Sequence, residues 1–212
     1  MKFINLNGPA FSGKDALAKE IAELVTVDNN VGIHVEFKGS LIDLAIRIAG
    51  INRELWDALY HRDYKEVPQP YFNVAGKQVS PRNWLIHISE NVAKPLFGEE
   101  YFGVALAKRV KDIAKSMEMD GYTCTFISSD GGFVHESVPV VKAVNGDYTL
   151  IRLHRTDPRT GNKLTFEGDS RNYIYSENFP ESARPKDFDV ENVNGKLTET
   201  AKLIIKLSEG KE

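Results

Sequence analysis

Short apolar runs alternate along this chain with longer stretches in which apolar residues recur at helical spacing. The first run, Phe3, Ile4 and Leu6, predicts a buried strand, and the apolar positions of residues 17–25 predict one face of a helix. Further strands are expected near residues 31–37, 122–127, 148–154 and 188–193, and further helices near 41–48, 52–65, 81–94, 101–119, 137–144 and 197–207. Strands that alternate with helices predict a mainly parallel sheet between two helical layers, a three-layer α/β/α fold in one domain of residues 1–212.

A glycine-bounded loop, Gly8-Pro9-Ala10-Phe11-Ser12-Gly13-Lys14-Asp15, separates the first strand from the first helix. Gly8 and Gly13 let the backbone turn tightly enough for consecutive N–H groups to point at one anion. The N-terminus of the following helix adds partial positive charge, and Lys14 adds a full one. This context predicts a phosphate-binding loop, with nucleotide phosphates bound by Gly8, Ala10, Phe11, Ser12, Gly13, Lys14, Asp15 and Ala16. The alternative is a glycine-rich turn that contains a Gly-Lys pair by chance.

Two acidic residues are candidates to hold Mg²⁺. Asp15 stands where such loops usually have a Ser or Thr whose hydroxyl binds the metal, and a carboxylate is also a hard oxygen ligand. It could equally be a first-turn helix residue that the dipole favours. Asp130 follows the strand expected at 122–127, and ligands bind at the carboxyl ends of strands in an open parallel sheet. A turn residue before two glycines is the other interpretation of Asp130.

The clearest helix start in the chain lies at Ser80 and Pro81. Ser80 is a cap residue, and Pro81 occupies the first helical position, where its missing N–H costs nothing. Pro95 and Gly98 should end this helix, whose expected buried stripe comprises Trp84, Leu85, Ile88 and Val92. Arg82 lies about 200° around the helix from Trp84, so we expect it to project from the body of the protein.

Residues 155–178 form a long polar segment with four basic residues and two glycines: Arg155, Arg159, Lys163, Arg171, Gly161 and Gly168. Segments of this length in a compact domain are usually functional or disordered. The segment follows a strand whose carboxyl end should face the phosphates, so we predict a mobile lid that brings positive charge over them. A solvated loop with scattered charges is the alternative.

Composition narrows the class of protein. The 212 residues are 42% hydrophobic and 27% charged, as in ordinary soluble globular proteins. The net charge of −3 supplies no basic field for nucleic acid, and no apolar run approaches the length of a membrane span. Cys124 is the single cysteine, which excludes an internal disulfide and a cysteine-built metal site. The first residues are a strand rather than a signal peptide, so we expect a protein of the cytoplasm.

Several blocks of sequence together resemble the phage-type deoxynucleoside monophosphate kinases. The loop from Gly8 to Asp15 is similar to theirs, in which an Asp commonly follows the Lys. Four further blocks are similar: residues 37–41, the Ser80-Pro81-Arg82 helix down to Tyr101-Phe102-Gly103-Val104, residues 128–136, and the tail from Glu191 and Asn192 to Leu197. Only the phosphate loop is specific on its own. Two positions depart from the family: Ala16 replaces its usual Thr, and Gly132 replaces an Arg that it often has.

The resemblance implies a P-loop NTPase fold with two insertions, a nucleoside-monophosphate-binding region at about residues 38–100 and a lid at about 155–178. It implies a kinase that transfers the γ-phosphoryl group of ATP to a (deoxy)nucleoside monophosphate, with ATP and Mg²⁺ as its cofactors. Such a reaction needs positioning, neutralised charge and excluded water.

The resemblance also suggests roles for individual residues. Lys14 would bind the β- and γ-phosphates, and Asp15 or Asp130 would lie in the shell of the Mg²⁺ ion. Arg82 would bind the acceptor phosphate, because a planar guanidinium suits a phosphate better than an ammonium does. Arg155 and Arg159 would close from the lid onto the developing charge. The remaining candidates contact the substrate: Lys38, Tyr71, Phe72, Trp84 and Arg171. The aromatic ones would stack on the base, although a core position is the preferred interpretation of Trp84, and Arg171 or Arg155 would replace the Arg absent at Gly132.

Two other functions stay open from the sequence. One is a phosphate-loop kinase for another small acceptor, such as a sugar or a metabolite acid. The other is a non-catalytic nucleotide-binding or assembly protein, for which Gly132 is the supporting feature. The sequence does not determine the base, the sugar or the oligomeric state, and a homodimer is compatible with it.

Overall fold

The computed structural model describes residues 1–61, 63–169 and 171–210 and divides the chain into two compact units. The first, which we call the sheet unit, comprises Met1–Phe37 and Gly103–Glu212. The second, the inserted unit, is the continuous stretch Lys38–Phe102. The family resemblance implied a nucleoside-monophosphate-binding region at about residues 38–100. Its role in binding an acceptor stays a prediction.

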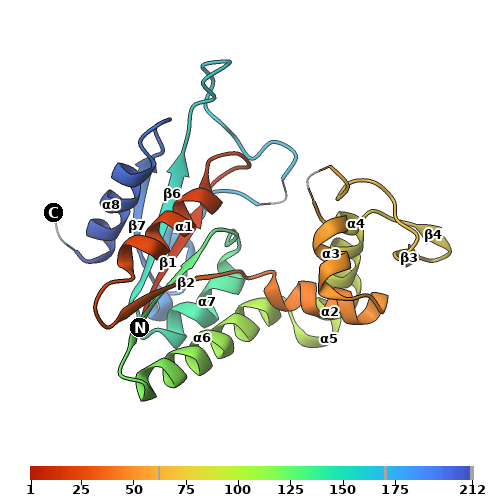
Figure 1. The fold of residues 1–212 in the computed structure, drawn as a ribbon, viewed down its shortest axis with the longest axis horizontal. Helices are drawn as coiled ribbons and strands as arrows, with labels where there is room; N and C mark the ends of the chain where they lie inside the picture. Colours follow the sequence, from red (N-terminus) through yellow and green to blue (C-terminus); the bar gives the residue numbers. More distant parts are fainter. Residues whose placement is uncertain (62, 170, 211–212) are drawn as a thin grey trace. The chain divides into compact units, whose positions relative to one another are not determined.

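The sheet unit is built on five parallel strands in the order β2-β5-β1-β6-β7 (Figure 1). Their bounds are β1 Lys2–Asn7, β2 Asn30–Val35, β5 Thr123–Ser128, β6 Tyr148–His154 and β7 Lys186–Glu191. The central strand, β1, pairs Ile4 with Ile127 of β5 on one side and with Thr149 of β6 on the other. Because all five strands run the same way, the residues that follow them gather at one edge of the sheet.

Helices cover both faces of this sheet. Helices α1 (Lys14–Val25) and α8 (Leu197–Ser208) pack on one face, in a core that includes Leu6, Ile21 and Ile204. Helices α6 (Tyr101–Met119) and α7 (Val134–Ala143) supply core residues on the other face, beside Phe3, Phe126 and Leu150. Burying each such aliphatic side chain stabilises the fold by about 1.5–3 kcal/mol. The predicted three-layer α/β/α arrangement with a parallel sheet is confirmed.

The inserted unit has a core of its own around Trp56, Phe72 and Trp84. Its elements are α2 Gly39–Ala49, α3 Arg53–Leu59, the strands β3 Asn73–Val74 and β4 Lys77–Gln78, α4 Pro81–His87, the π-helix η1 Ile88–Ala93, and α5 Lys94–Phe97. Helix α3 is shorter than the helix expected at 52–65, a range that includes Arg62, which lies outside the described residues. The strands form a hairpin inside a stretch predicted as loop, because Ala75 and Gly76 take the positive φ angles of a two-residue turn.

The helix that begins at Pro81 starts as predicted, and of the two residues predicted to end it, Gly98 does so and Pro95 does not. Ser80 Oγ accepts a hydrogen bond of 3.2 Å from the Asn83 N–H, which caps the first turn. Pro95 does not end the helix, because the turn before it widens into η1, where the Lys94 N–H bonds Ser89 O. The wider turn buries Ala93 where the α-helical spacing predicted Val92. Gly98, with φ 91°, is the residue that ends the helix.

Two short 3₁₀ helices, η2 (Ser176–Asn178) and η3 (Glu181–Ala183), precede β7. No helix among the described residues combines the length and the apolar character needed to cross a membrane.

Candidate functional site

The predicted phosphate loop connects the carboxyl end of β1, the central strand, to the first turn of α1. Gly13 caps α1 in the left-handed conformation, with φ 90°. A Cβ atom at Gly13 would lie 2.5 Å from Asn192 Nδ2, and one at Gly8 would lie 2.8 Å from Leu153 O. Both glycines are therefore required by close packing, and Gly13 by its backbone conformation as well.

The side chain of Lys14 folds back over the loop. Its Nζ donates hydrogen bonds of 2.6 Å to Gly8 O and to Pro9 O, and lies 3.4 Å from Ser12 Oγ. The pKa of Lys14 is lowered to about 8, first by burial and next by the charge of Arg171, while Asp15, Asp169 and Asp130 act in the opposite direction. The loop thus holds a partly desolvated ammonium group, with one other cation and three carboxylates close enough to interact with it.

Residues that follow β6 and β7 hold the loop from outside. Asn192, which is buried, donates from Nδ2 to Ser12 O at 2.7 Å. Arg155 Nη1 donates to Phe11 O at 3.3 Å, and its Nη2 donates to Asn194 Oδ1 at 3.1 Å. Arg155 is thus anchored at the loop rather than carried on a detached lid. The contact of Asn192 was missed from the sequence, although its position directly after a parallel strand was a signal for it.

Asp130 lies at the same edge, two residues beyond the end of β5. Its Oδ1 accepts hydrogen bonds of 2.9 Å from the Phe37 N–H and from Ser128 Oγ. Asp15 is exposed in the first turn of α1. Among the described residues, no group of three or more His, Cys, Asp or Glu forms a metal site. Mg²⁺ in phosphoryl-transfer enzymes is usually held by one or two carboxylates together with the phosphates, so Asp15 and Asp130 fit an ion that binds with the nucleotide.

Gly132, the departure from the family pattern, lies under the side chain of Arg171. A Cβ atom at Gly132 would lie 2.7 Å from Arg171 Cδ and 2.9 Å from Cγ. Arg171 also interacts with the charge of Lys14. The segment after β6 thus places the aliphatic stem of an arginine on the position where the family often has an arginine, and the glycine provides the room for it.

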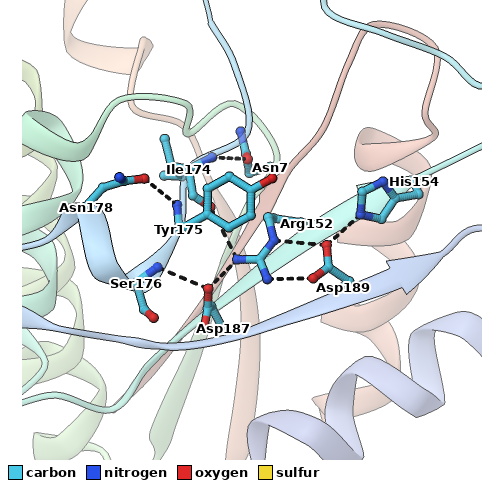
Figure 2. A network of polar contacts seen from close by, with 9 residues as sticks. All are labelled: Asn7, Arg152, His154, Ile174, Tyr175, Ser176, Asn178, Asp187 and Asp189. Atoms are coloured by element: carbon cyan, nitrogen blue, oxygen red, sulfur yellow. Dashed lines mark hydrogen bonds and ion pairs between the residues drawn. The ribbon is translucent and has the colours of Figure 1, made fainter.

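The second half of the predicted lid is bound to the sheet. Asn7, at the end of β1, donates from Nδ2 to Asn172 O at 3.1 Å and accepts the Ile174 N–H at 3.0 Å. Arg152 of β6 is paired with Asp187 and Asp189 of β7 and donates to Ile174 O, while the Tyr175 ring lies 4.3 Å from its guanidinium (Figure 2). We call residues 172–179 the strap. Its buried contacts leave residues 155–169 as the part in which lid motion stays a prediction; Ser170 lies outside the described residues.

The first half of that segment folds as a small hairpin. Thr156 and Lys163 form a bridge, the Leu164 N–H bonds Arg155 O, and the Asp157 N–H bonds Asn162 O. Arg159, predicted to act on the developing charge, lies near the tip of this hairpin with 87% of its side chain exposed. Its catalytic role stays a prediction.

The remaining candidates belong to the inserted unit, and burial divides them. Phe72 is fully buried, and Trp84 is 6% exposed with its Nε1 donating to Ala45 O at 3.1 Å. Their rings stack on each other in the core. The burial expected for Trp84 is confirmed, and Phe72 is a core residue rather than an exposed stacking partner for a base. Tyr71 is exposed, and Arg82 projects as expected, 3.5 Å from Glu66. The Lys38 backbone carbonyl accepts the Ile42 N–H at the start of α2, and the substrate roles of Tyr71, Arg82 and Lys38 stay predictions.

Comparisons with known proteins were made for the whole chain. No family model matches it, and no curated protein matches it. Among solved structures, the chain is similar to a gluconokinase from Sinorhizobium meliloti 1021, with 14% identity over 99% of this chain and 94% of that one and a TM-score of 0.39. Similarity at this level does not decide a function, which therefore rests on the geometry of the phosphate loop.

Proposed function

We propose that the protein is a kinase that transfers the γ-phosphoryl group of ATP to a small acceptor, and that the acceptor is a (deoxy)nucleoside monophosphate. The observation that supports phosphoryl transfer is the setting of Lys14. Its ammonium group lies over a glycine-bounded loop at the carboxyl end of the central strand, and Asp130 follows the neighbouring strand. Loop amides, a lysine and a nearby carboxylate are the parts that bind a nucleoside triphosphate in this class of site.

Each part has a defined task in that reaction. The loop N–H groups and the α1 N-terminus bind the phosphate oxygens, and Lys14 exchanges its carbonyl partners for the β- and γ-phosphates. Mg²⁺, when bound, would neutralise phosphate charge, with Asp15 and Asp130 as its candidate ligands. Asn192 and Arg155 keep the loop backbone in place, because each bonds one of its carbonyl groups. Arg82 is the candidate for the acceptor phosphate, and Arg171 for the group in transfer.

A small acceptor other than a nucleotide is the second candidate. It is favoured by the burial of Phe72 and Trp84, which leaves Tyr71 as the exposed ring among the residues predicted to stack on a base. A non-catalytic protein is less well supported, because the stem of Arg171 lies on Gly132 and brings an arginine to the position where the family often has one. The nucleoside monophosphate is preferred because the sequence blocks around Ser80 and Ser128 resemble that family.

A coupled assay of ADP release tests these proposals. We expect ATP-dependent ADP release with at least one nucleoside monophosphate in a full panel, and none with sugars or metabolite acids. The Lys14→Ala variant should lose at least about 10³-fold in turnover, because it loses the charge on the transferred group. Near-normal turnover of folded Lys14→Ala would contradict the phosphate-loop assignment, and release with a sugar alone would replace the acceptor by the second candidate.

A further inference from the structure

The segment between β6 and β7 contains the pattern Asp-x-Arg twice, at Asp157 and Arg159 and again at Asp169 and Arg171. In both, the carboxylate of the Asp accepts the backbone N–H of the Arg, at 2.9 Å in the first and 3.0 Å in the second. The contacts of the two guanidinium groups differ. Asp169 holds that of Arg171 through Nε at 2.9 Å and Nη2 at 2.6 Å, whereas Arg159 reaches Asp157 only at 3.5 Å.

The second pair lies at the edge of the sheet where the phosphate loop begins. The stem of Arg171 lies directly on Gly132, where a Cβ atom would meet its Cβ, Cγ and Cδ atoms. The residue after it, Asn172, is bonded to Asn7, which immediately precedes the loop. The strap that continues from there is held by Arg152 and its two aspartates (Figure 2). Arg171 is therefore held by three features: its stem packs on Gly132, its guanidinium is bonded to Asp169, and the chain that follows it is bonded to the sheet.

We propose that Asp169 is a positioning residue, which orients the guanidinium of Arg171, whose stem lies on Gly132, so that Arg171 and Lys14 together receive the phosphoryl group in transfer. This inference rests on the proposed phosphoryl transfer and deepens it. Arg171 is the residue that contacts the phosphate, and Asp169 acts through it.

The arrangement has a physical reason in the charges. Two cations that lie near each other in a partly buried site repel, and an anion between them removes that cost. The repulsion is visible in Lys14, whose pKa is lowered first by burial and next by Arg171. A guanidinium that is already oriented loses little conformational freedom when a phosphate arrives, so it stabilises the developing charge more than a mobile one would.

The first test asks whether the Asp169→Asn substitution lowers or raises kcat. Asp169→Asn keeps an oxygen that can accept the Arg171 N–H, but removes the charge that fixes the guanidinium. Loss of a carboxylate beside a phosphate site should by itself improve anion binding. Positioning predicts the opposite: kcat falls by about tenfold while the KM for ATP changes by less than about twofold. An unchanged or higher kcat would overturn the proposal.

Asp157→Asn is the matched control, because it makes the same chemical change in the other turn of the same segment. We expect its effect on kcat to be at least fivefold smaller than that of Asp169→Asn, since it holds its arginine by the weaker contact. Equal losses in the two variants would mean that the turns only shape the segment, and the proposal would be wrong.

Chemical rescue separates positioning from folding. Arg171→Gly should lower kcat by about 10²-fold. Added guanidinium chloride at millimolar concentration should raise kcat of this variant at least tenfold, because Asp169 and Gly132 still form the site that held the guanidinium of Arg171, which we call the guanidinium seat. The double variant Arg171→Gly, Asp169→Asn should show no such recovery. If guanidinium raises kcat of both variants equally, or of neither, Asp169 does not position the guanidinium, and the proposal is wrong.

A binding measurement distinguishes failure of this inference from failure of the proposed function. Inorganic tripolyphosphate, titrated calorimetrically into the intact protein, reports the phosphate site without any transfer step. We expect Arg171→Gln to weaken its binding by about tenfold and Asp169→Asn to weaken rather than strengthen it. If the wild-type protein binds tripolyphosphate but phosphorylates no acceptor, the proposed function fails. The positioning role of Asp169 is then decided by the tripolyphosphate affinities of the two variants. If it phosphorylates an acceptor while both variants bind and turn over normally, the proposed function stands and only the positioning role of Asp169 is wrong.

Discussion

The hairpin of residues 155–164 and the strap of residues 172–179 belong to one segment of sequence but differ in how they are held. The hairpin is closed mainly by its own backbone bonds, and its arginine at 159 points into solvent. The strap is tied to β1, β6 and β7 through Asn7, Arg152 and Asp187. Each half carries or borders an Asp-x-Arg turn, so the difference lies in long-range contacts rather than in local sequence. A positive charge in a polar segment becomes part of a site only where tertiary contacts fix it.

The largest expected effect compares the two arginines directly. Arg171→Ala should lower kcat by about 10²-fold, because it removes a fixed cation beside the group in transfer. Arg159→Ala should lower kcat by roughly tenfold or less, because the exposed side chain must first be brought to the phosphates by hairpin motion. Steady-state kinetics on the two purified variants decides this, and a larger loss in Arg159→Ala would reverse the comparison.

A second expectation concerns the support of the strap. Arg152→Met leaves Asp187 and Asp189 without the guanidinium that pairs with both, which should destabilise the fold by roughly 2 kcal/mol, a value below that for fully buried pairs because Asp189 is half exposed. Urea unfolding measures this loss. Arg53→Met, which breaks an exposed pair with Asp57 in the inserted unit, is the control and should cost less than about 1 kcal/mol.

Proteolysis sharpens the same contrast. In the absence of nucleotide, trypsin should cut at Arg159 or Lys163 in the hairpin well before it cuts at Arg171, because local opening is easier where backbone bonds are exposed and few buried contacts hold the chain. Mass spectrometry of early fragments identifies the sites. Early cleavage at Arg171, equal in rate to that in the hairpin, would show that the strap does not restrain its N-terminal end.

The smallest expected effect is on acid stability. The hydrogen bond from Arg152 holds the pKa of Asp189 at about 2, against the opposing effect of burial and with further help from His154. Burial alone would raise the pKa of Asp187, but bonds from Arg152 and the Ser176 N–H lower it overall. Carboxyls with lowered folded pKa values stabilise the fold above their ordinary pKa near 3.8 and lose this contribution as pH falls toward 2. Urea midpoints at pH 5 and pH 3 should therefore differ less in Arg152→Met than in the wild-type protein.

Local signals in the sequence were sufficient for most of the fold. The alternation of apolar runs gave the five strands and their parallel arrangement, and Ser80 with Pro81 marked a helix start that the structure reproduces. The strand, glycine-bounded loop and helix on which the predicted phosphate site depends are present, because glycines, lysine and flanking elements are contiguous in the sequence. These features depend on neighbouring residues, which a single sequence displays directly.

What the sequence did not reveal depends on contacts between distant residues. Asn192 bonds a loop that lies 180 residues earlier, and Arg171 fills the space above Gly132. Phe72 looked like a base-stacking candidate, yet it lies with Trp84 in the inserted unit's core, because that small unit needs large apolar side chains to bury. Asp169 had no signal beyond a pattern that the chain also uses at Asp157.

The π-helix Ile88–Ala93 links the chain length of this stretch to the proline that follows it. Deleting one residue from an α-helix rotates everything after it by about 100° and turns buried positions outward. A π-turn already holds about one residue more than the α-helical repeat, so deleting Asn91, which is exposed, would return this stretch to a regular helix. The step from Ile88 to Ala93 would then shorten from five residues to four and preserve the phase of the residues after it, but the turn before Pro95 would lose the widening that accommodates this proline inside the helix.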